Sequence, residues 1–199
     1  MPSAVQSRRS TKLKKLPRSF YAREAERLAH DLIGTILVHR IDGEERRGRI
    51  VETEAYVGCQ DLACHAAKGR TARTEVMFGK AGHAYVYLIY GIHDMLNIVS
   101  GAPGVAQAVL VRAAEPLSGW EANLSGPGNL AKGFGITRRL HNGIDLRGNE
   151  LFLLESTDVT PPRIVRTRRI GVDYAKQWKD APLRFIDADS PAVSRPKFR

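Results

Sequence analysis

The segment from Arg49 to Tyr56 constrains the fold most, because its β-branched residues and regular alternation indicate a β-strand. Alternate side chains of a strand point to the same face. One face would turn mostly apolar or small side chains toward a core: Val51, Thr53, Ala55 and Val57. The other would carry two carboxylates and an aromatic ring: Ile50, Glu52, Glu54 and Tyr56. This second face is either a solvated polar surface or a carboxylate held against an aromatic wall.

The charge balance favours a polyanionic partner. The chain has 199 residues, of which 43% are apolar and 26% charged, and its formal net charge is +10. These values predict one soluble globular domain, and a basic balance is typical of proteins that bind nucleic acid. No stretch approaches the roughly 20 apolar residues of a membrane helix. We find no basic amphipathic helix of the kind that binds a membrane surface, so no membrane partner is expected.

The two cysteines do not indicate a disulfide framework or a metal site. Cys59, Cys64 and His65 form a Cys-x4-Cys-His pattern. Structural zinc sites usually have four ligands at tighter spacing. We therefore expect two reduced cysteines and no metal, with a local disulfide or a structural metal as the alternatives.

Residues 1–18 are basic, free of acidic groups and poor in apolar ones. This composition predicts a disordered arm that touches DNA or only aids solubility, followed by a single domain over residues 19–199. An organelle transit peptide is a further alternative for the arm. The segment lacks the apolar stretch of a secretory signal.

The first part of the domain has the pattern of a helix followed by a hairpin. Ser19 is a plausible N-cap, and Gly34 suits the end of the helix. The apolar stripe between them has helical spacing: Ala25, Leu28, Ala29 and Leu32. A strand over residues 35–41, an Asp42-Gly43 turn and a strand over residues 47–57 would follow.

An irregular loop over residues 58–82 should lead to a tyrosine-rich strand over residues 84–90. The length of this loop and its mixture of small and cationic residues suit either a ligand-binding surface or a plain surface loop. Tyr85 and Tyr87 would share one face of the strand, and Tyr90 would lie on the other, beside the turn at Gly91. For these tyrosines ordinary core packing is the alternative to a binding role.

The remaining elements complete a sheet-rich pattern. Strands are expected at residues 95–99, 107–113, 150–155, 164–172 and 183–186, and a short helix at 129–134. Arg112 ends an apolar run and therefore needs an anion, for which Glu54 and Glu115 are candidates. A basic cluster in the late strand is either a solvated face or a DNA contact: Arg163, Arg166, Arg168 and Arg169. The fold class is therefore α+β, a single domain with a curved, mostly antiparallel sheet and a few flanking helices.

Several motifs occur in the order that is typical of one enzyme family. They are the segment 47–56, His65, Met77-Phe78, the strand 85–91, Asn97, residues 110–117, residues 169–172 and residues 182–185. In these motifs the chain resembles the alkyladenine (3-methylpurine) DNA glycosylase family over roughly residues 20–186. The segment 118–150 is shorter and richer in glycine than in the animal members. Cys59 and Cys64 do not belong to the pattern.

The resemblance implies an enzyme that flips a damaged purine out of duplex DNA and hydrolyses its N-glycosidic bond, without metal or cofactor. Its expected substrates are 3-methyladenine, 7-methylguanine, hypoxanthine and ethenoadenine. Glu54 matches the catalytic base, Arg112 and the carbonyl of Ile170 match the groups that hold the attacking water, and Tyr90 matches the wedge inserted into DNA. Three residues match the walls of the base pocket and one matches the screen against guanine: Tyr56, His65, Tyr87 and Asn97.

Two other functions stay open on sequence alone. A non-catalytic nucleic-acid-binding domain accounts for the charge but leaves Glu54, Tyr56 and Arg112 without a purpose. A bifunctional glycosylase-lyase needs a lysine of depressed pKa near the sugar, and no lysine lies among the pocket motifs. The expected partner is double-stranded DNA that contains a damaged purine, bound by a monomer. The expected location is the bacterial cytoplasm at the nucleoid, or the nucleus or an organelle if the source is eukaryotic.

Overall fold

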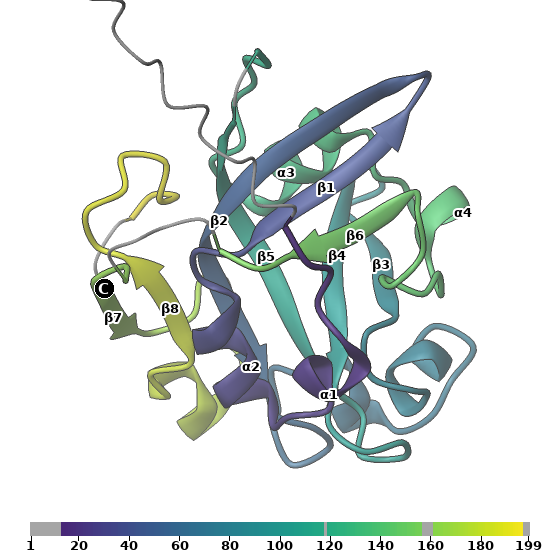
Figure 1. The fold of residues 1–199 in the computed structure, drawn as a ribbon. Helices are drawn as coiled ribbons and strands as arrows, with labels where there is room; N and C mark the ends of the chain where they lie inside the picture. The colour runs from purple at the N-terminus through teal and green to yellow at the C-terminus, as the bar shows by residue number, and fades with distance from the viewer. Residues whose placement is uncertain (1–12, 118, 157–160, 197–199) are drawn as a thin grey trace, which may run out of the picture.

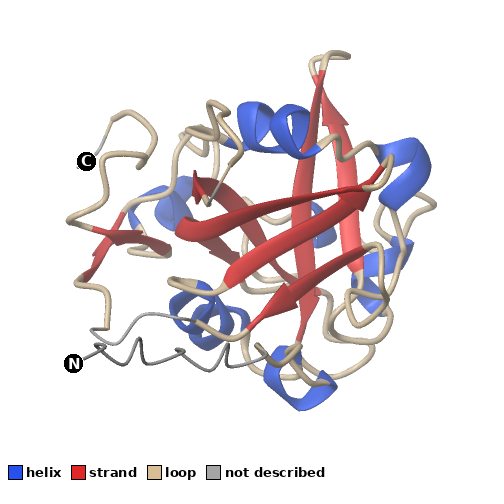
Figure 2. Cartoon of the chain, turned by 45° about the horizontal axis from the view of Figure 1, so that its top comes forward, coloured by secondary structure: helices blue, strands red, loops and turns tan. Residues whose placement is uncertain are grey.

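The computed structural model describes residues 13–117, 119–156 and 161–196. Within them, one antiparallel sheet of eight strands forms the body of the domain (Figure 1). The strands are β1 (Ile36–Ile41), β2 (Glu44–Tyr56), β3 (Ala84–Ile89), β4 (His93–Ser100), β5 (Gln107–Pro116), β6 (Leu151–Leu154), β7 (Ile164–Thr167) and β8 (Arg184–Asp187). Figure 2 shows the strands at the two ends of the sheet crossing one another, because the sheet curls. The predicted α+β class with a curved sheet is confirmed.

The long strand β2 is the one on which the sheet is assembled. It pairs with β5 along one edge, and on its other edge first with β1 and then with β8. The path of the sheet is β3-β4-β5-β2-β1-β6, and β7 adds to β8. The turn between β1 and β2 is the predicted one, with positive φ at both Asp42 and Gly43.

Two register shifts in the β2–β5 pair change the predicted faces of β2. They lie between Ile50 and Glu52 and between Glu52 and Thr53. An extra residue in a strand turns the side chains that follow it to the opposite face. Ile50 therefore packs in the main core with Ala55, and Val51 packs in a different cluster. The predicted placement of these two residues is wrong, since strict alternation holds only for an unbulged strand.

Four helices flank the sheet among the described residues: α1 (Arg18–Tyr21), α2 (Ala25–Leu32), α3 (Pro127–Phe134) and α4 (Arg138–His141). The predicted first helix is divided, because Ser19 lies inside α1 and caps nothing, whereas α2 begins at Ala25. Gly34 has the positive φ expected after a helix end. Short 3-10 turns occupy His65–Lys68, Glu75–Phe78 and Lys176–Asp180. Helix α4 was not predicted from sequence.

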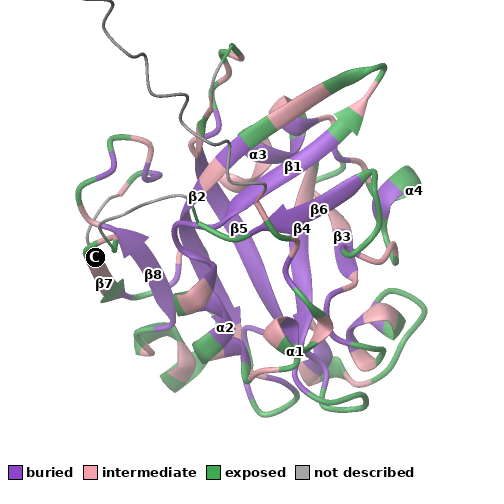
Figure 3. Cartoon of the chain, in the orientation of Figure 1, coloured by how far each residue is buried: buried purple, intermediate pink, exposed green. Residues whose placement is uncertain are grey.

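The main core lies between the sheet and helices α2 and α3 (Figure 3). All four residues of the α2 stripe are fully buried there: Ala25, Leu28, Ala29 and Leu32. Burying a leucine stabilises a fold by roughly 1.5–3 kcal/mol, which exceeds what an isolated eight-residue helix gains from its own hydrogen bonds. Packing therefore holds α2 in place.

The domain begins earlier than the predicted boundary at residue 18. Lys15 forms a β-bridge with Leu154, and Leu16 is buried in the main core. The rest of the predicted arm, residues 1–12, lies outside the described residues.

The late strand is shorter than predicted, since β7 ends at Thr167. Among the described residues, no helix is long and apolar enough to cross a membrane.

Candidate active site

A cavity of about 340 Å³ opens between the β3–β5 part of the sheet and the segment that follows β7. This volume lies in the range of small-ligand sites. Seven of the eight predicted site residues line it: Tyr56, His65, Tyr87, Tyr90, Asn97, Arg112 and Ile170. The eighth, Glu54, lies behind them with no exposed surface.

The antiparallel register explains how residues distant in sequence meet at this cavity. Tyr85 lies opposite Asn97, Asn97 opposite Leu110, Leu110 opposite Glu54, and Glu54 opposite Arg184. Directly paired residues of neighbouring strands point to the same side of a sheet. One row across five strands therefore carries the cavity floor and the carboxylate beside it.

Three groups hold the carboxylate of Glu54. The backbone N–H of Ile170 donates to Oε1 over 2.7 Å, and the hydroxyl of Tyr56 donates to Oε2 over 3.0 Å. The Nη1 of Arg112 donates to Oε2 over 3.3 Å. Burial, followed by the charge of Glu54, raises the pKa of Tyr56 well above its usual value, so the phenol keeps its proton and donates it. All three partners line the cavity, so Glu54 is fixed directly beside it.

A second carboxylate, Glu52, orients Arg112. Its Oε1 accepts the Nε–H of Arg112 over 2.7 Å and that of Arg184 over 2.8 Å, and its other oxygen accepts the backbone N–H of Ser194 over 2.7 Å. Burial lowers the pKa of Arg112, but the charges of Glu54 and Glu52 outweigh burial and raise it. Two carboxylates and two guanidinium groups are thus buried as a balanced set, as buried charges require.

The bulge in the β2–β5 pair is what brings Arg112 to this position. Glu52 pairs with Ala113 and Thr53 pairs with Val111, so Arg112 has no opposite residue on β2. Its side chain reaches both Glu52 and Glu54, which lie two residues apart. Bulges commonly redirect a side chain beside a functional site.

The aromatic wall combines three rings on two elements. The rings of His65 and Tyr87 lie 4.5 Å apart between centroids, edge to face, and Nδ1 of His65 lies 2.9 Å from the hydroxyl of Tyr85. Burial, followed by the charges of Arg73 and Lys68, lowers the pKa of His65 to about 4. The imidazole is therefore neutral at physiological pH, and the wall carries no positive charge of its own.

Asn97 is buried on β4 and held by its amide. Its Nδ2 donates to the carbonyl of Tyr85 over 3.2 Å and to that of Met95 over 3.3 Å. Two backbone acceptors on one amide group leave the side chain little freedom to turn. Asn97 is thus a fixed steric boundary of the cavity.

Tyr90 lies at the tip of the β3–β4 hairpin and is 87% exposed. Its φ is 53° and that of Gly91 is 74°, so the turn begins at Tyr90 and not after it. Ile92, at the same tip, is 72% exposed. Two large apolar side chains in water at one hairpin tip are unusual for a free surface.

The segment that presents Ile170 is anchored by its neighbour. Arg169 is buried and paired with Asp61, with its Nη1 donating over 2.5 Å to Oδ2 of Asp61 and over 2.9 Å to the carbonyl of Ala55. Its guanidinium lies 4.8 Å from the ring centroid of Tyr56. The cation therefore supports the back of one cavity wall and fixes the loop that holds Glu54.

The sequence profile described as methylpurine-DNA glycosylase matches residues 19–191 of the chain. The chain belongs to the methylpurine-DNA glycosylase family. The resemblance predicted from the motifs is confirmed, and with it the assignment as a DNA glycosylase of base-excision repair.

Bacterial relatives are similar over almost the whole chain. A protein of Legionella pneumophila (strain Lens) is 49% identical over 92% of this chain and 100% of its own length. One from Anaeromyxobacter sp. (strain Fw109-5) is 51% identical over 91% and 93%, and one from Myxococcus xanthus (strain DK1622) is 53% identical over 90% and 93%. Each bears the name "putative 3-methyladenine DNA glycosylase".

The structure decides between the two anions considered for Arg112 in this methylpurine-DNA glycosylase family member and shows how the late basic cluster is paired. Glu115 is not a partner of Arg112, because it pairs with Arg49 over 2.7 Å on the opposite half of β2. In the late basic cluster, Arg163, Arg166 and Arg168 are exposed to solvent, whereas Arg169 is buried. Each of its arginines pairs with a carboxylate of the domain: Arg163 with Asp189, Arg166 with Glu26, Arg168 with Asp180 and Arg169 with Asp61.

Sequence reasoning also missed part of this candidate site. Glu52, Arg184 and Ser194 form the network behind Arg112, and Tyr85 and Tyr174 line the cavity. The single arginine in the apolar strand around residue 184 could have predicted a buried ion pair. No sequence pattern predicted the contact of Ser194 with Glu52. The two cysteines are free, with Cys64 buried at the cavity and Cys59 exposed.

Proposed function

We propose that the chain removes alkylated or deaminated purines from duplex DNA by hydrolysing the N-glycosidic bond, and leaves an abasic site. The observation that carries this proposal is Glu54. It is a fully buried carboxylate held by three donors, and all three of them line an aromatic cavity. The names of the bacterial relatives support alkylated adenine as the first substrate class to test.

The proposed chemistry assigns Glu54 two tasks. Water enters between Tyr56, Arg112 and Ile170, where Arg112 and the carbonyl of Ile170 hold it. The bond between the sugar and the purine nitrogen breaks with its electron pair on the base, and the sugar becomes oxocarbenium-like. Glu54 stabilises this cation and takes a proton from the water as the new C–O bond forms.

The cavity walls suit a purine that carries a positive charge. Stacking on aromatic rings stabilises any base by roughly 1–3 kcal/mol. A cation over an aromatic face gains roughly 0.5–2 kcal/mol more. The neutral state of His65 matters here, because a protonated imidazole would repel 3-methyladenine or 7-methylguanine. Hypoxanthine and ethenoadenine lack this charge and would depend on stacking and on shape, which Asn97 limits.

The exposed hairpin tip supplies the part that enters DNA. Flipping a base costs a few kcal/mol and leaves a gap in the stack. Tyr90 would fill the gap, and Ile92 would lie against the neighbouring step. Helix α4 packs against β3 and carries exposed Arg138 and Arg139. In the proposed complex these two arginines would meet phosphates beside the wedge. The proposed partner is double-stranded DNA bound by a monomer, and bacterial relatives favour the bacterial cytoplasm as its location.

A duplex with a single hypoxanthine, compared with one that carries 3-methyladenine, tests this function. Our expectation is release of free base, with strand breaks only after alkali treatment. Strand cleavage without alkali would instead indicate a glycosylase-lyase, although no lysine is found among the described residues that line the cavity. Tight binding without base release from either duplex would indicate a binding domain and contradict the proposal.

A further inference from the structure

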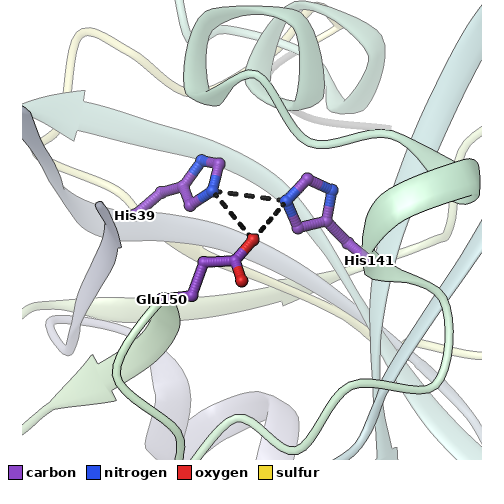
Figure 4. A group of neighbouring side chains, drawn as sticks. All are labelled: His39, His141 and Glu150. Atoms are coloured by element: carbon purple, nitrogen blue, oxygen red, sulfur yellow. Dashed lines mark hydrogen bonds and ion pairs between the residues drawn. The ribbon is translucent and has the colours of Figure 1, made fainter. Parts of the chain in front are cut away.

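Two histidines and a glutamate meet outside the aromatic cavity, where β1, the end of α4 and the start of β6 come together (Figure 4). His39 lies on β1, His141 is the last residue of α4, and Glu150 immediately precedes β6. Both imidazoles are buried, whereas the side chain of Glu150 is 62% exposed. None of the three lines the aromatic cavity.

The three facing atoms have the spacing of ligands around one small cation. The Nε2 atoms of His39 and His141 are 3.2 Å apart, and Oε1 of Glu150 lies 3.4 Å from the second and 3.9 Å from the first. Ligands bound to zinc at about 2.0–2.1 Å in a tetrahedron are separated from one another by about 3.3 Å. A cation between these atoms therefore requires only small side-chain movements.

The hydrogen bonds at Nδ1 leave the Nε2 lone pair of His39 free and allow His141 either tautomer. Nδ1 of His39 lies 2.6 Å from the carbonyl of Phe134, to which its N–H donates, and so Nε2 is the unprotonated nitrogen. Nδ1 of His141 accepts the backbone N–H of Thr137 over 2.9 Å, and in the other tautomer it can donate to the carbonyl of Thr137, 3.1 Å away. A backbone acceptor behind each imidazole is the usual support of a metal-ligating histidine. The exposed Glu150 gives an ion a path from solvent and leaves room for a water ligand.

We propose that His39, His141 and Glu150 bind a divalent cation of the Zn²⁺ class that fastens α4 to β1 and β6. Two imidazoles and a carboxylate suit Zn²⁺ and its neighbours among the transition metals. Helix α4 has only four residues, and its attachment to the wedge hairpin includes the bond from the N–H of Arg138 to Asp94. A metal at His141 would therefore stiffen the segment that carries Arg138 and Arg139 beside Tyr90.

The same atoms permit a metal-free state. The N–H of Thr137 lies 2.9 Å from Nδ1 of His141, and accepting it would leave the proton of His141 on Nε2, where it donates to His39. Metal binding moves that proton to Nδ1 and needs no net proton release. The two histidines therefore either bind an ion or share one N–H···N hydrogen bond. A direct measurement of metal binding distinguishes these two states.

The experiment uses the full-length, untagged protein with Cys59→Ser, which removes the exposed thiol as a competing ligand. After chelator treatment, Zn²⁺ alone is titrated by calorimetry, and Co²⁺ alone is titrated by visible absorption. We expect one ion per chain, a raised melting temperature and the intense bands of tetrahedral Co²⁺. Absence of stoichiometric binding, or a spectrum of octahedral Co²⁺ only, would overturn the proposal.

Variants locate the ion. Glu150→Gln changes an exposed side chain and should fold normally, yet weaken Zn²⁺ binding at least tenfold. His141→Asn keeps a polar group near the position of Nδ1 but removes Nε2, and should abolish the Co²⁺ bands. The control is His30→Asn, since His30 also contacts a carboxylate, Asp31, but is exposed and lacks a second imidazole. Unchanged binding in both Glu150→Gln and His141→Asn, or equal loss in His30→Asn, would place the ion elsewhere.

Discussion

Replacement of Glu54 by glutamine tests the chemistry most directly. Glutamine keeps the size of the side chain and an oxygen that can accept the N–H of Ile170, but it has no charge and does not take a proton from water. A carboxylate about 4 Å from an oxocarbenium ion stabilises it by roughly 4 kcal/mol at an effective dielectric constant of 20. That corresponds to roughly a 10³-fold rate, and loss of a positioned base alone typically costs 10²- to 10⁴-fold. We expect single-turnover excision to fall by at least about 10³-fold.

The fold should tolerate Glu54→Gln because Arg112 keeps its stronger partner. Arg112 donates to Glu52 over 2.7 Å and to Glu54 over 3.3 Å, so the guanidinium stays paired when Glu54 loses its charge. The side-chain amide would face both this donor and the hydroxyl of Tyr56. The hydroxyl can turn and accept from the amide, and the remaining unsatisfied contact with Arg112 costs about 1–3 kcal/mol. Breaking a buried pair outright would cost about 3–5 kcal/mol. DNA binding should survive, and removing a negative charge near phosphates favours it.

The matched control is Asp187→Asn. Asp187 is a buried carboxylate paired with Arg49 over 2.8 Å, and it does not line the cavity. It should lose stability to a similar degree in denaturant unfolding and keep excision within a few-fold. The measurement is single-turnover release of hypoxanthine, together with a binding titration and an unfolding curve for each variant. A Glu54→Gln rate within tenfold of the parent, or an equal loss of activity in Asp187→Asn, would refute the reasoning.

Four further predictions concern the wedge, the screen, the histidine and the overall charge. Tyr90→Ala should reduce excision far more from duplex than from single-stranded substrate at unchanged stability, and equal losses would make Tyr90 a packing residue. Asn97→Ser should release normal guanine above background, because the smaller side chain opens space for the exocyclic amine, and chromatography of the freed bases measures this release. Guanine release at background, together with normal excision of damaged bases, would show that Asn97 is not the screen. Between its folded pKa of about 4 and its ordinary 6.5, His65 binds fewer protons in the folded than in the unfolded protein, so stability should rise with pH across this window. Urea unfolding at pH 4.5 and pH 6.5 should show a smaller rise for His65→Gln, and an identical rise would contradict the assignment. Affinity for undamaged duplex should fall steeply with salt, with a slope of about −0.9 in log-log form for each neutralised phosphate, and a flat dependence would argue against phosphate contacts.

The glutamine variant of Glu52 shows how the tertiary structure changes an experiment. In sequence, Glu52 lies two residues from Glu54, so Glu52→Gln suggests itself as an internal control that should keep clearly more activity. In the structure, Glu52 accepts hydrogen bonds from Arg112, Arg184 and Ser194. Its replacement would remove the carboxylate charge that faces two buried guanidinium groups and would disturb Arg112 itself. We therefore expect Glu52→Gln to be the less stable of the two variants, and its residual activity to depend on how far Arg112 moves.

Sequence alone determined the elements that depend on local patterns. The Asp42-Gly43 turn, the tyrosine-rich strand β3 and the apolar stripe of α2 follow from backbone preference and periodicity, which act over a few residues. Motif order determined the family, since several spaced motifs rarely coincide by chance. Seven of the eight residues chosen in this way line one cavity, and the eighth lies directly behind it.

Tertiary structure alone decided which charges pair and how the carboxylates are held. Arg112 had two candidate anions in sequence, Glu54 and Glu115, and its tightest contact is to a third, Glu52. Strand alternation could not foresee this, because the two register shifts in the β2–β5 pair redirect side chains by adding a residue to a strand. Ser194 reaches Glu52 across 142 positions of the chain. A contact of that separation has no local signature, since it depends on how the whole sheet curls and on where the chain returns.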